Sequence, residues 1–172
     1  STSFINAQCD LPTVDGEFQH QEVTEVDDAN KKQLYKAMLL TLAKLYKNSE
    51  EVIEYKDQEE GVILIRYYEN FIHKTIGYKE HFFKFDVKFE FKDGKYRSTA
   101  SYVSHYAVGG TSRVRCDCVN EITNPKCGTT LCTTQKEWNK NRCKAYDELK
   151  STLSLISETV KSNIKKQSDD DW

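Results

Sequence analysis

The sequence lacks the features that mark membrane-spanning chains and nucleic-acid-binding proteins. No apolar run approaches the roughly 20 residues that a bilayer-crossing helix needs. The longest such run, Ala37 to Leu45, is interrupted by Thr41 and Lys44. The formal net charge is −2, so the chain has no overall positive field that would attract nucleic acid. We therefore expect no transmembrane segment and no nucleic-acid partner.

The sequence also lacks the short motifs of catalytic and phosphate-binding sites. Gly109-Gly110 is not followed by the Lys-Ser or Lys-Thr of a phosphate loop, and Ser104-His105 reads as part of a strand rather than as a nucleophile elbow. The histidines form no His-x3-His or His-Glu-x2-His pattern, and we expect them at the surface or at strand ends rather than as metal ligands or general bases. They are His20, His73, His81 and His105. These absences predict a protein that is not an enzyme and holds no cofactor.

The clearest positive signal is a pair of strands joined by Asp93-Gly94. From Phe83 to Lys92, apolar and charged residues alternate with period two, which is typical of a strand with one buried and one solvated face. Asp-Gly between two such arms predicts a type I′ turn, which places Glu90 opposite Arg97. We expect a helix to cover the apolar face, although its aromatic row could instead line a ligand groove. That face collects Phe83, Phe85, Val87, Phe89, Phe91, Tyr96, Ala100 and Tyr102.

Periodicity also predicts the elements before this hairpin. Residues 17–26 read as a first strand, whose apolar residues are Phe18, Val23 and Val26. Asp27 or Asp28 is predicted to cap a helix over residues 29–46. A second hairpin joins residues 51–56 to residues 62–68, and the alternation in its second strand could bury both faces. Residues 71–80 are predicted to connect this strand to the next.

A long helix is predicted near the end of the chain. Thr134 to Glu137 read as a capping box, and an apolar stripe runs from Trp138 to Ile164. The order β-α-β-β-β-β-α predicts an α+β domain with an antiparallel sheet of about five strands and two helices packed on one face. We expect an extended lead-in at residues 1–16 and one domain over residues 17–167. That domain would contain a cysteine-rich insert at residues 111–133 and be followed by an acidic tail at residues 168–172.

This order resembles a Bacteroidetes family of unknown function with a TATA-binding-protein-like (TBP-like) fold. The segments that carry the resemblance are the strand into Asp27-Asp28, the helical stretch from Leu34-Tyr35 to Leu45-Tyr46, the hairpin from Phe89 to Arg97, and the opening Glu137-Trp138 of the late helix. The resemblance implies a curved antiparallel sheet with helices on one side. It also implies an exported protein, often with a signal peptide or lipid anchor, and it supplies no activity and no site residues.

The fold name does not imply DNA binding. A saddle on DNA needs Lys and Arg across its concave face, whereas the polar face of the hairpin mixes Lys84 and Lys88 with Asp86 and Glu90.

The start of the chain bears on localisation. The chain begins with Ser1, and its only methionine is Met38, so we expect that an upstream segment was removed. If that segment was a signal peptide or held a lipid anchor, the protein is exported to the periplasm or the outer-membrane surface.

The cysteines allow three interpretations. In an exported protein an even number suggests disulfides, each stabilising by roughly 2–4 kcal/mol. Zinc could be held by Cys116, Cys118, Cys127 and Cys132, although the Cys-x2-Cys knuckle is absent. The third interpretation is that the cysteines are free thiols. Cys143 could tie the late helix to the cysteine-rich loop, whereas Cys9 needs a distant partner or stays free. The disulfide candidates are Cys9, Cys116, Cys118, Cys127, Cys132 and Cys143.

A set of tyrosines offers a possible binding face, although these could equally be ordinary strand residues. We expect a non-catalytic, exported binding or structural module whose partner is a protein, peptide or glycan. One alternative is a metal-binding protein or enzyme that uses the cysteine-rich loop. Another is an inhibitor of a cell-envelope hydrolase, suggested by a stapled loop around Asn124-Pro125. The tyrosines are Tyr67, Tyr68, Tyr102 and Tyr106.

Overall fold

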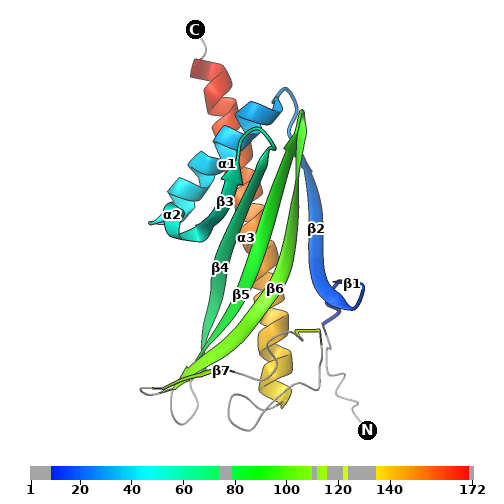
Figure 1. The fold of residues 1–172 in the computed structure, drawn as a ribbon, viewed down its shortest axis with the longest axis vertical. Helices are drawn as coiled ribbons and strands as arrows, with labels where there is room; N and C mark the ends of the chain where they lie inside the picture. The colour runs from blue at the N-terminus through cyan, green and yellow to red at the C-terminus, as the bar shows by residue number, and fades with distance from the viewer. Residues whose placement is uncertain (1–8, 74–78, 110–111, 116–121, 124–134, 171–172) are drawn as a thin grey trace, which may run out of the picture. The chain divides into compact units, whose positions relative to one another are not determined.

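The computed structural model describes residues 9–73, 79–109, 112–115, 122–123 and 135–170 (Figure 1). The described residues form an α+β structure with a seven-stranded sheet of order β1-β2-β6-β5-β4-β3, in which β7 pairs with β6. The pairs β1–β2, β3–β4 and β6–β7 are antiparallel, as predicted. The elements are β1 (Thr13–Val14), β2 (Glu17–Glu25), α1 (Lys31–Leu45), α2 (Ser49–Val52), β3 (Ile53–Asp57), β4 (Val62–His73), β5 (Lys79–Lys92), β6 (Lys95–Gly109), β7 (Ser112–Arg115) and α3 (Gln135–Asp170).

The chain divides into two compact units. Unit 1 comprises residues 1–19, 68–84 and 102–148, and unit 2 comprises residues 20–67, 85–101 and 149–172. Strands β4, β5 and β6 and helix α3 each contribute residues to both units. The domain boundaries expected from the sequence stay a prediction.

In unit 2, the apolar face of the strands is buried under α1 and the second part of α3 (Figure 1). Tyr35 of α1 packs edge-on against Phe91 of β5, with ring centroids 5.7 Å apart. Tyr96 of β6 is 2% exposed, and its ring centroid lies 5.9 Å from that of Phe91. The predicted buried face is therefore confirmed along both arms of the hairpin, and it does not line an open groove.

The prediction of a strand buried on both faces is wrong. Strand β4 is not buried on both faces, because Ile63 and Ile65 are fully buried while Val62 and Leu64 on the other face are only half-buried. Val23 of β2 is 57% exposed, since its side chain points away from the apolar face.

The alternation of buried residues changes phase within β6. Ala100 and His105 are both buried, although period two cannot place residues five apart on one face. A β-bulge, which inserts one extra residue, produces such a shift. Tyr102, between these two positions, is half-buried.

The start of α1 is set by Asn30 rather than by Asp27 or Asp28. The Asn30 side chain accepts a hydrogen bond from the Gln33 amide, and the Gln33 side chain accepts one from the Asn30 amide, so the two form a capping box. The helix cannot begin earlier, because Asp28 has a positive φ of 61°, which lies outside the right-handed helical region.

The Asp93-Gly94 turn is not of type I′. Gly94 has a φ of 75°, but the φ of Asp93 is negative, whereas type I′ needs positive φ at both central residues. The turn is docked on the start of α1: the Gly94 amide donates to the Ala29 carbonyl at 2.8 Å, and Asp93 accepts from the Lys31 amide at 2.7 Å. The predicted turn geometry occurs instead at Asp15-Gly16, where both φ values are positive and β1 joins β2.

Other element boundaries also differ from those predicted. Helix α2 precedes β3 in the first arm of the second hairpin, and β4 and β5 extend into the expected connector at residues 71–73 and 79–80. Strands β1 and β7 fall within the predicted lead-in and cysteine-rich insert. Helix α3 continues to Asp170, because residues 167–170 include no Gly or Pro that would stop it. Thr134, in the predicted capping box, lies outside the described residues.

Candidate binding face of the sheet

Four side chains of unit 1 gather on the sheet face opposite the buried residues, and we call them the aromatic cluster. They come from three neighbouring strands, β4, β5 and β6. The Phe82 and Tyr106 rings stack with centroids 4.8 Å apart and planes 11° apart. Tyr68 packs edge-on against Tyr106 at 6.2 Å, and Lys84 Nζ lies 5.6 Å from the Tyr68 ring centroid. The members are Tyr68, Phe82, Lys84 and Tyr106.

The cluster combines accessible ring surface with polar groups beside it. Tyr68 is 45% exposed, and the other members are half-buried. Asn70 lies two residues after Tyr68 on β4, and Glu80 lies two residues before Phe82 on β5, so both are on the same sheet face as the cluster. Asn70 Nδ2 donates a hydrogen bond to Glu80 Oε1 at 2.8 Å. Aromatic planes flanked by an amide and a carboxylate can hold the flat apolar face of a ligand and hydrogen-bond with its polar edge.

The structure separates the four tyrosines proposed from the sequence. Tyr68 and Tyr106 meet in the aromatic cluster. Tyr67 points to the opposite face, is 5% exposed and stacks on Phe85 at 5.9 Å, because neighbouring residues of a strand face opposite ways. Tyr102 is half-buried, and burial raises the pKa of its phenol well above the usual range. The binding role of the tyrosines stays a prediction.

The sequence reasoning missed Phe82 as a member of the face. The sequence does contain a signal for Phe82. This residue directly precedes the alternating run, and it occupies the same alternate positions as the charged residues of that run. An aromatic residue on an otherwise polar strand face is the pattern to notice.

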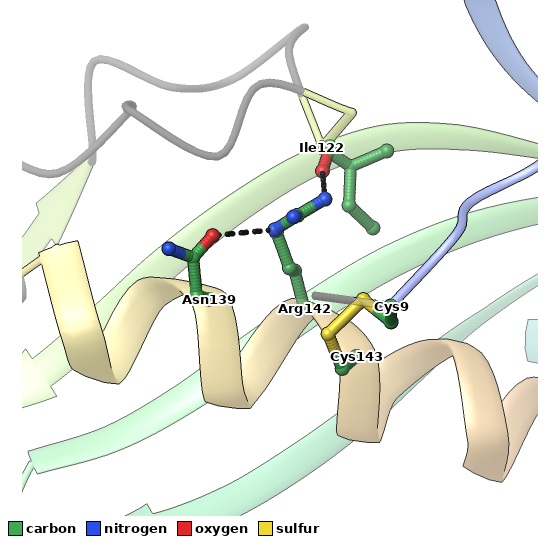
Figure 2. Close-up of a disulfide and its surroundings, with 5 residues drawn as sticks. All are labelled: Cys9, Ile122, Asn139, Arg142 and Cys143. Atoms are coloured by element: carbon green, nitrogen blue, oxygen red, sulfur yellow. Dashed lines mark hydrogen bonds between the residues drawn. A yellow bond between two sulfur atoms is a disulfide. The ribbon is translucent and has the colours of Figure 1, made fainter. Parts of the chain in front are cut away.

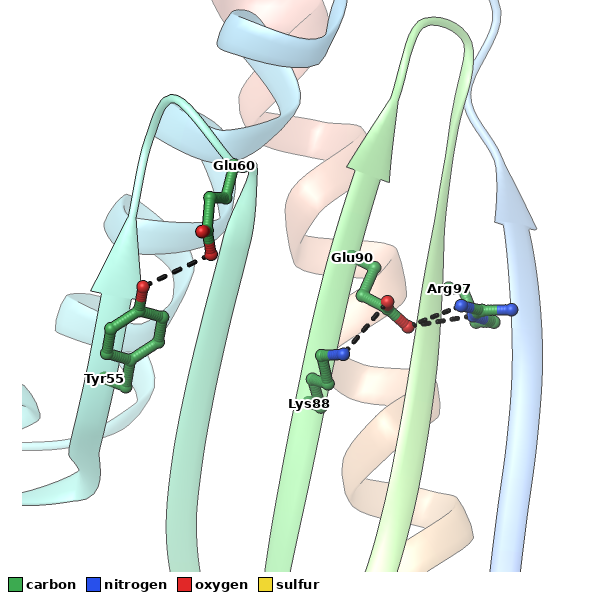
Figure 3. Close-up of polar contacts among 5 residues, drawn as sticks. All are labelled: Tyr55, Glu60, Lys88, Glu90 and Arg97. Atoms are coloured by element: carbon green, nitrogen blue, oxygen red, sulfur yellow. Dashed lines mark hydrogen bonds and ion pairs between the residues drawn. The ribbon is translucent and has the colours of Figure 1, made fainter.

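The same sheet face in unit 2 carries paired charges. Glu90 accepts hydrogen bonds from Arg97 Nη2 at 2.7 Å and from Lys88 Nζ at 3.0 Å (Figure 3). Burial acts to raise the pKa of Glu90, but the hydrogen bonds from Arg97 and Lys88 outweigh it and hold the pKa below the usual value. Arg66 donates to both oxygens of Asp86 at 2.6 and 2.8 Å, and its Nη1 lies 3.6 Å from Glu54 Oε1. Three cations therefore meet three carboxylates, and these strand residues offer no excess of one sign to a ligand.

A pair of histidines lies on the buried face of unit 1. His81 and His105 are each 1% exposed, and His81 Nδ1 lies 2.9 Å from His105 Nε2. Phe83 and Trp138 stack or tilt against the His105 ring at 4.5 and 5.2 Å. Burial, and then the neighbouring His81, lower the pKa of His105 to about 3. The His105 ring is thus neutral at physiological pH.

This pair contradicts the expectation of surface or strand-end histidines, because both rings are enclosed by core aromatics. His20 is half-buried and bonds with Glu22 at 2.8 Å, and the His73 side chain is outside the described part. Within the described residues, no three His, Cys, Asp or Glu side chains are placed to hold a metal ion.

A disulfide joins Cys9, which precedes β1, to Cys143 of α3 (Figure 2). The two Cα atoms are 5.5 Å apart, a separation usual for such a bridge. The expectation that Cys143 ties the helix to the cysteine-rich loop is wrong, because this turn of α3 lies beside the lead-in segment. The other four cysteines, and with them the zinc candidates and Asn124-Pro125, lie outside the described residues.

Arg142, the neighbour of Cys143, is a buried cation held by neutral oxygens. Its Nε donates to Asn139 Oδ1 at 2.9 Å and its Nη1 to the Ile122 carbonyl at 3.1 Å (Figure 2). Burial lowers the pKa of Arg142. These bonds fix the buried Ile122 against α3, which is a structural role.

A sheet with strand order β1-β2-β6-β5-β4-β3 and helices on one face places the chain among α+β proteins with a TBP-like fold. The model of the family described as "Domain of unknown function (DUF4468) with TBP-like fold" matches residues 20–106. The chain therefore belongs to this family, which confirms the resemblance seen in the sequence. The matched segment contains the whole aromatic cluster and excludes both cysteines of the disulfide.

Two solved structures share the fold. A TBP-like protein from Parabacteroides distasonis ATCC 8503 is 12% identical with a TM-score of 0.62, over 87% of this chain and 96% of that chain. A DUF4468 family protein from Bacteroides ovatus ATCC 8483 is 14% identical with a TM-score of 0.56, over 85% and 90%. At these identities the likeness concerns the fold alone. No curated protein matches the sequence.

Proposed function

We propose that this protein is a non-catalytic, exported binding module that takes a glycan on the aromatic cluster. The observation that carries the proposal is the accessible Tyr68 ring beside the stacked Phe82 and Tyr106 rings. Tyrosine supplies a large, rigid contact surface at low entropic cost. A sugar ring pairs a flat C–H face with hydroxyl groups at its edge, which suits aromatic planes next to the Asn70–Glu80 pair.

The Cys9–Cys143 disulfide supports the exported part of the proposal. Disulfides persist in oxidising compartments such as the periplasm and the cell surface, and they are rare in the cytosol. The proposed location is therefore the periplasm or the outer-membrane surface.

Chemical-shift mapping in a titration with bacterial cell-envelope oligosaccharides would test the proposal. We expect shifts concentrated on the outward residues of β4, β5 and β6 in unit 1. Tyr68→Ala should weaken binding about 5- to 30-fold, since it removes a ring whose contribution to binding is about 1–2 kcal/mol. Tyr55→Ala is the matched control, because Tyr55 on β3 is 46% exposed and Tyr68 is 45% exposed. Tyr55 bonds only with Glu60 at 3.3 Å (Figure 3), and its removal should leave affinity unchanged.

Three outcomes would count against the proposal. Equal loss in both variants would show that the aromatic cluster is not the site. Binding of extended peptides but of no oligosaccharide would change the ligand class. Turnover of a bound oligosaccharide would overturn the non-catalytic part.

A further inference from the structure

We propose that the outer surface of the helices in unit 2 binds an anionic lipid surface. The centre of this surface is one line of side chains on α1, which we call the lysine stripe. Its members are four residues apart, so they lie one above another on a single helix face. Leu40 lies within the stripe and is 47% exposed. The stripe consists of Lys32, Lys36, Leu40 and Lys44, all of which are exposed.

The lysines of the stripe have no counter-charge. Helix α1 contains no Asp or Glu along its whole length, and Lys32, Lys36 and Lys44 make no ion pair within the described part of the chain. On the sheet face of the same unit, by contrast, Arg66 and Arg97 are matched with carboxylates. The stripe lysines are thus left open, whereas the arginines of the sheet face are matched.

Helix α3 adds to this surface. Asn163 Nδ2 donates to Thr41 Oγ1 of α1 at 3.0 Å, which ties the two helices together. Lys166, three residues after Asn163, is exposed, and Leu155 is 51% exposed. Helix α3 therefore also carries an exposed lysine and an accessible leucine.

Helix stability does not explain the lysine stripe. Like charges four residues apart repel and destabilise a helix. Lys32 is also in the first turn, where the helix dipole disfavours a cation. We expect lysines in such a helix-destabilising arrangement where their charges contact an external anion.

The residue types favour a lipid surface over a nucleic acid. The stripe has no arginine for bidentate phosphate contacts and no aromatic ring for base stacking. Lysines beside exposed leucines match helices that lie at an anionic bilayer surface, where the charges meet headgroups and the apolar residues enter the interface. No described helix is long and apolar enough to cross a membrane, so the contact would be peripheral.

Co-sedimentation of the full chain with lipid vesicles tests this inference. We expect binding to phosphatidylcholine vesicles that contain about 30% phosphatidylglycerol, little binding to phosphatidylcholine alone, and release at high salt. The double variant Lys32→Gln/Lys36→Gln should bind about 25-fold more weakly, because each lysine near an anionic surface contributes a factor of about five. Its unfolding midpoint in urea should be unchanged or higher, since the repulsion is removed.

The matched control is Lys136→Gln/Lys140→Gln. Lys136 and Lys140 are exposed, four residues apart on α3, and belong to unit 1, so the control removes the same charge at the same spacing. It should bind within about twofold of the unaltered protein, because the loss of overall charge alone is a small, screened effect. Equal loss in both double variants would overturn the lysine stripe as the site.

Leu40→Gln separates a lipid from a soluble polyanion. It should weaken vesicle binding and leave binding to heparin unchanged, because only a bilayer interface takes up the leucine. Heparin or DNA binding without vesicle binding would overturn the lipid assignment. Tyr68→Ala should leave vesicle binding intact, so the result is independent of the proposed glycan site.

Discussion

At the scale of single residues, the buried His81–His105 pair is the most unusual feature of unit 1. Two imidazoles share one hydrogen bond of 2.9 Å inside the core. One ring must donate and the other accept, so the bond requires at least one of the two rings to stay uncharged. His105 Nδ1 has no hydrogen-bond partner among the described residues, which adds to the cost of enclosing this ring.

We expect the protein to lose stability as the pH falls below about 6.5. The unfolded chain binds a proton at His105 near the ordinary histidine pKa of 6.5, whereas in the folded protein the pKa of His105 is about 3. The folded state therefore holds fewer protons in this window, and its stability is full above pH 6.5 and declines toward pH 3. Urea unfolding at a series of pH values should show a loss of about 2–3 kcal/mol by about pH 4.5.

The double variant His81→Phe/His105→Phe is the control for this titration. It replaces both rings at similar size and leaves neither imidazole without its partner. Its stability should fall less steeply between about pH 6.5 and about pH 4.5. An unchanged slope would assign the acid sensitivity to carboxylates elsewhere in the molecule.

At the scale of elements, the capping box of α1 gives the sharpest test. Asn30→Ala removes the side-chain oxygen that accepts from the Gln33 amide, and it should lower the free energy of unfolding by about 1 kcal/mol. Asn48→Ala is the matched comparison, because Asn48 precedes α2 without making any side-chain cap bond. Urea unfolding of the two variants should differ by about 1 kcal/mol, and equal effects would mean that the cap does not stabilise α1.

Period-two alternation predicted the hairpin arms and the covered face because burial dictates residue type at every second position. The start of α1 could not be predicted in this way. Asp27, Asp28 and Asn30 are all acceptable caps, and the choice is made by the Asp93-Gly94 turn, which bonds with Ala29 and Lys31. The same docking explains why this Asp-Gly turn departs from type I′ and the one at Asp15-Gly16 does not.

Only part of the candidate site could be predicted from the sequence. The opposite directions of Tyr67 and Tyr68 follow from strand geometry alone. The half-burial of Tyr102 falls where β6 changes phase between Ala100 and His105, and the sequence carries no Gly or Pro signal for that change. That Tyr68 meets Tyr106 depends on β4 and β6 flanking β5, which is a property of topology and not of either strand.

At the scale of the whole molecule, the disulfide spans almost the entire chain. The sequence separation of Cys9 and Cys143 is 134, and a bridge that closes a long loop restricts the unfolded chain strongly. Cys9→Ser/Cys143→Ser should lower the free energy of unfolding by about 2–4 kcal/mol, measured by urea unfolding without reductant. Reducing agent should have little further effect on the variant if this bridge dominates. Equal stability of the variant and the unaltered protein would contradict a stabilising bridge.

The distance between these two cysteines along the chain also fixes the order of assembly. During synthesis at about 5–20 residues per second, Cys143 follows Cys9 by 134 residues, which corresponds to a delay of roughly 7–27 s. All seven strands lie between these two cysteines in the sequence, so this bridge cannot form before the last helix has followed every strand. The bridge can therefore lock a finished fold, but it cannot guide an early one.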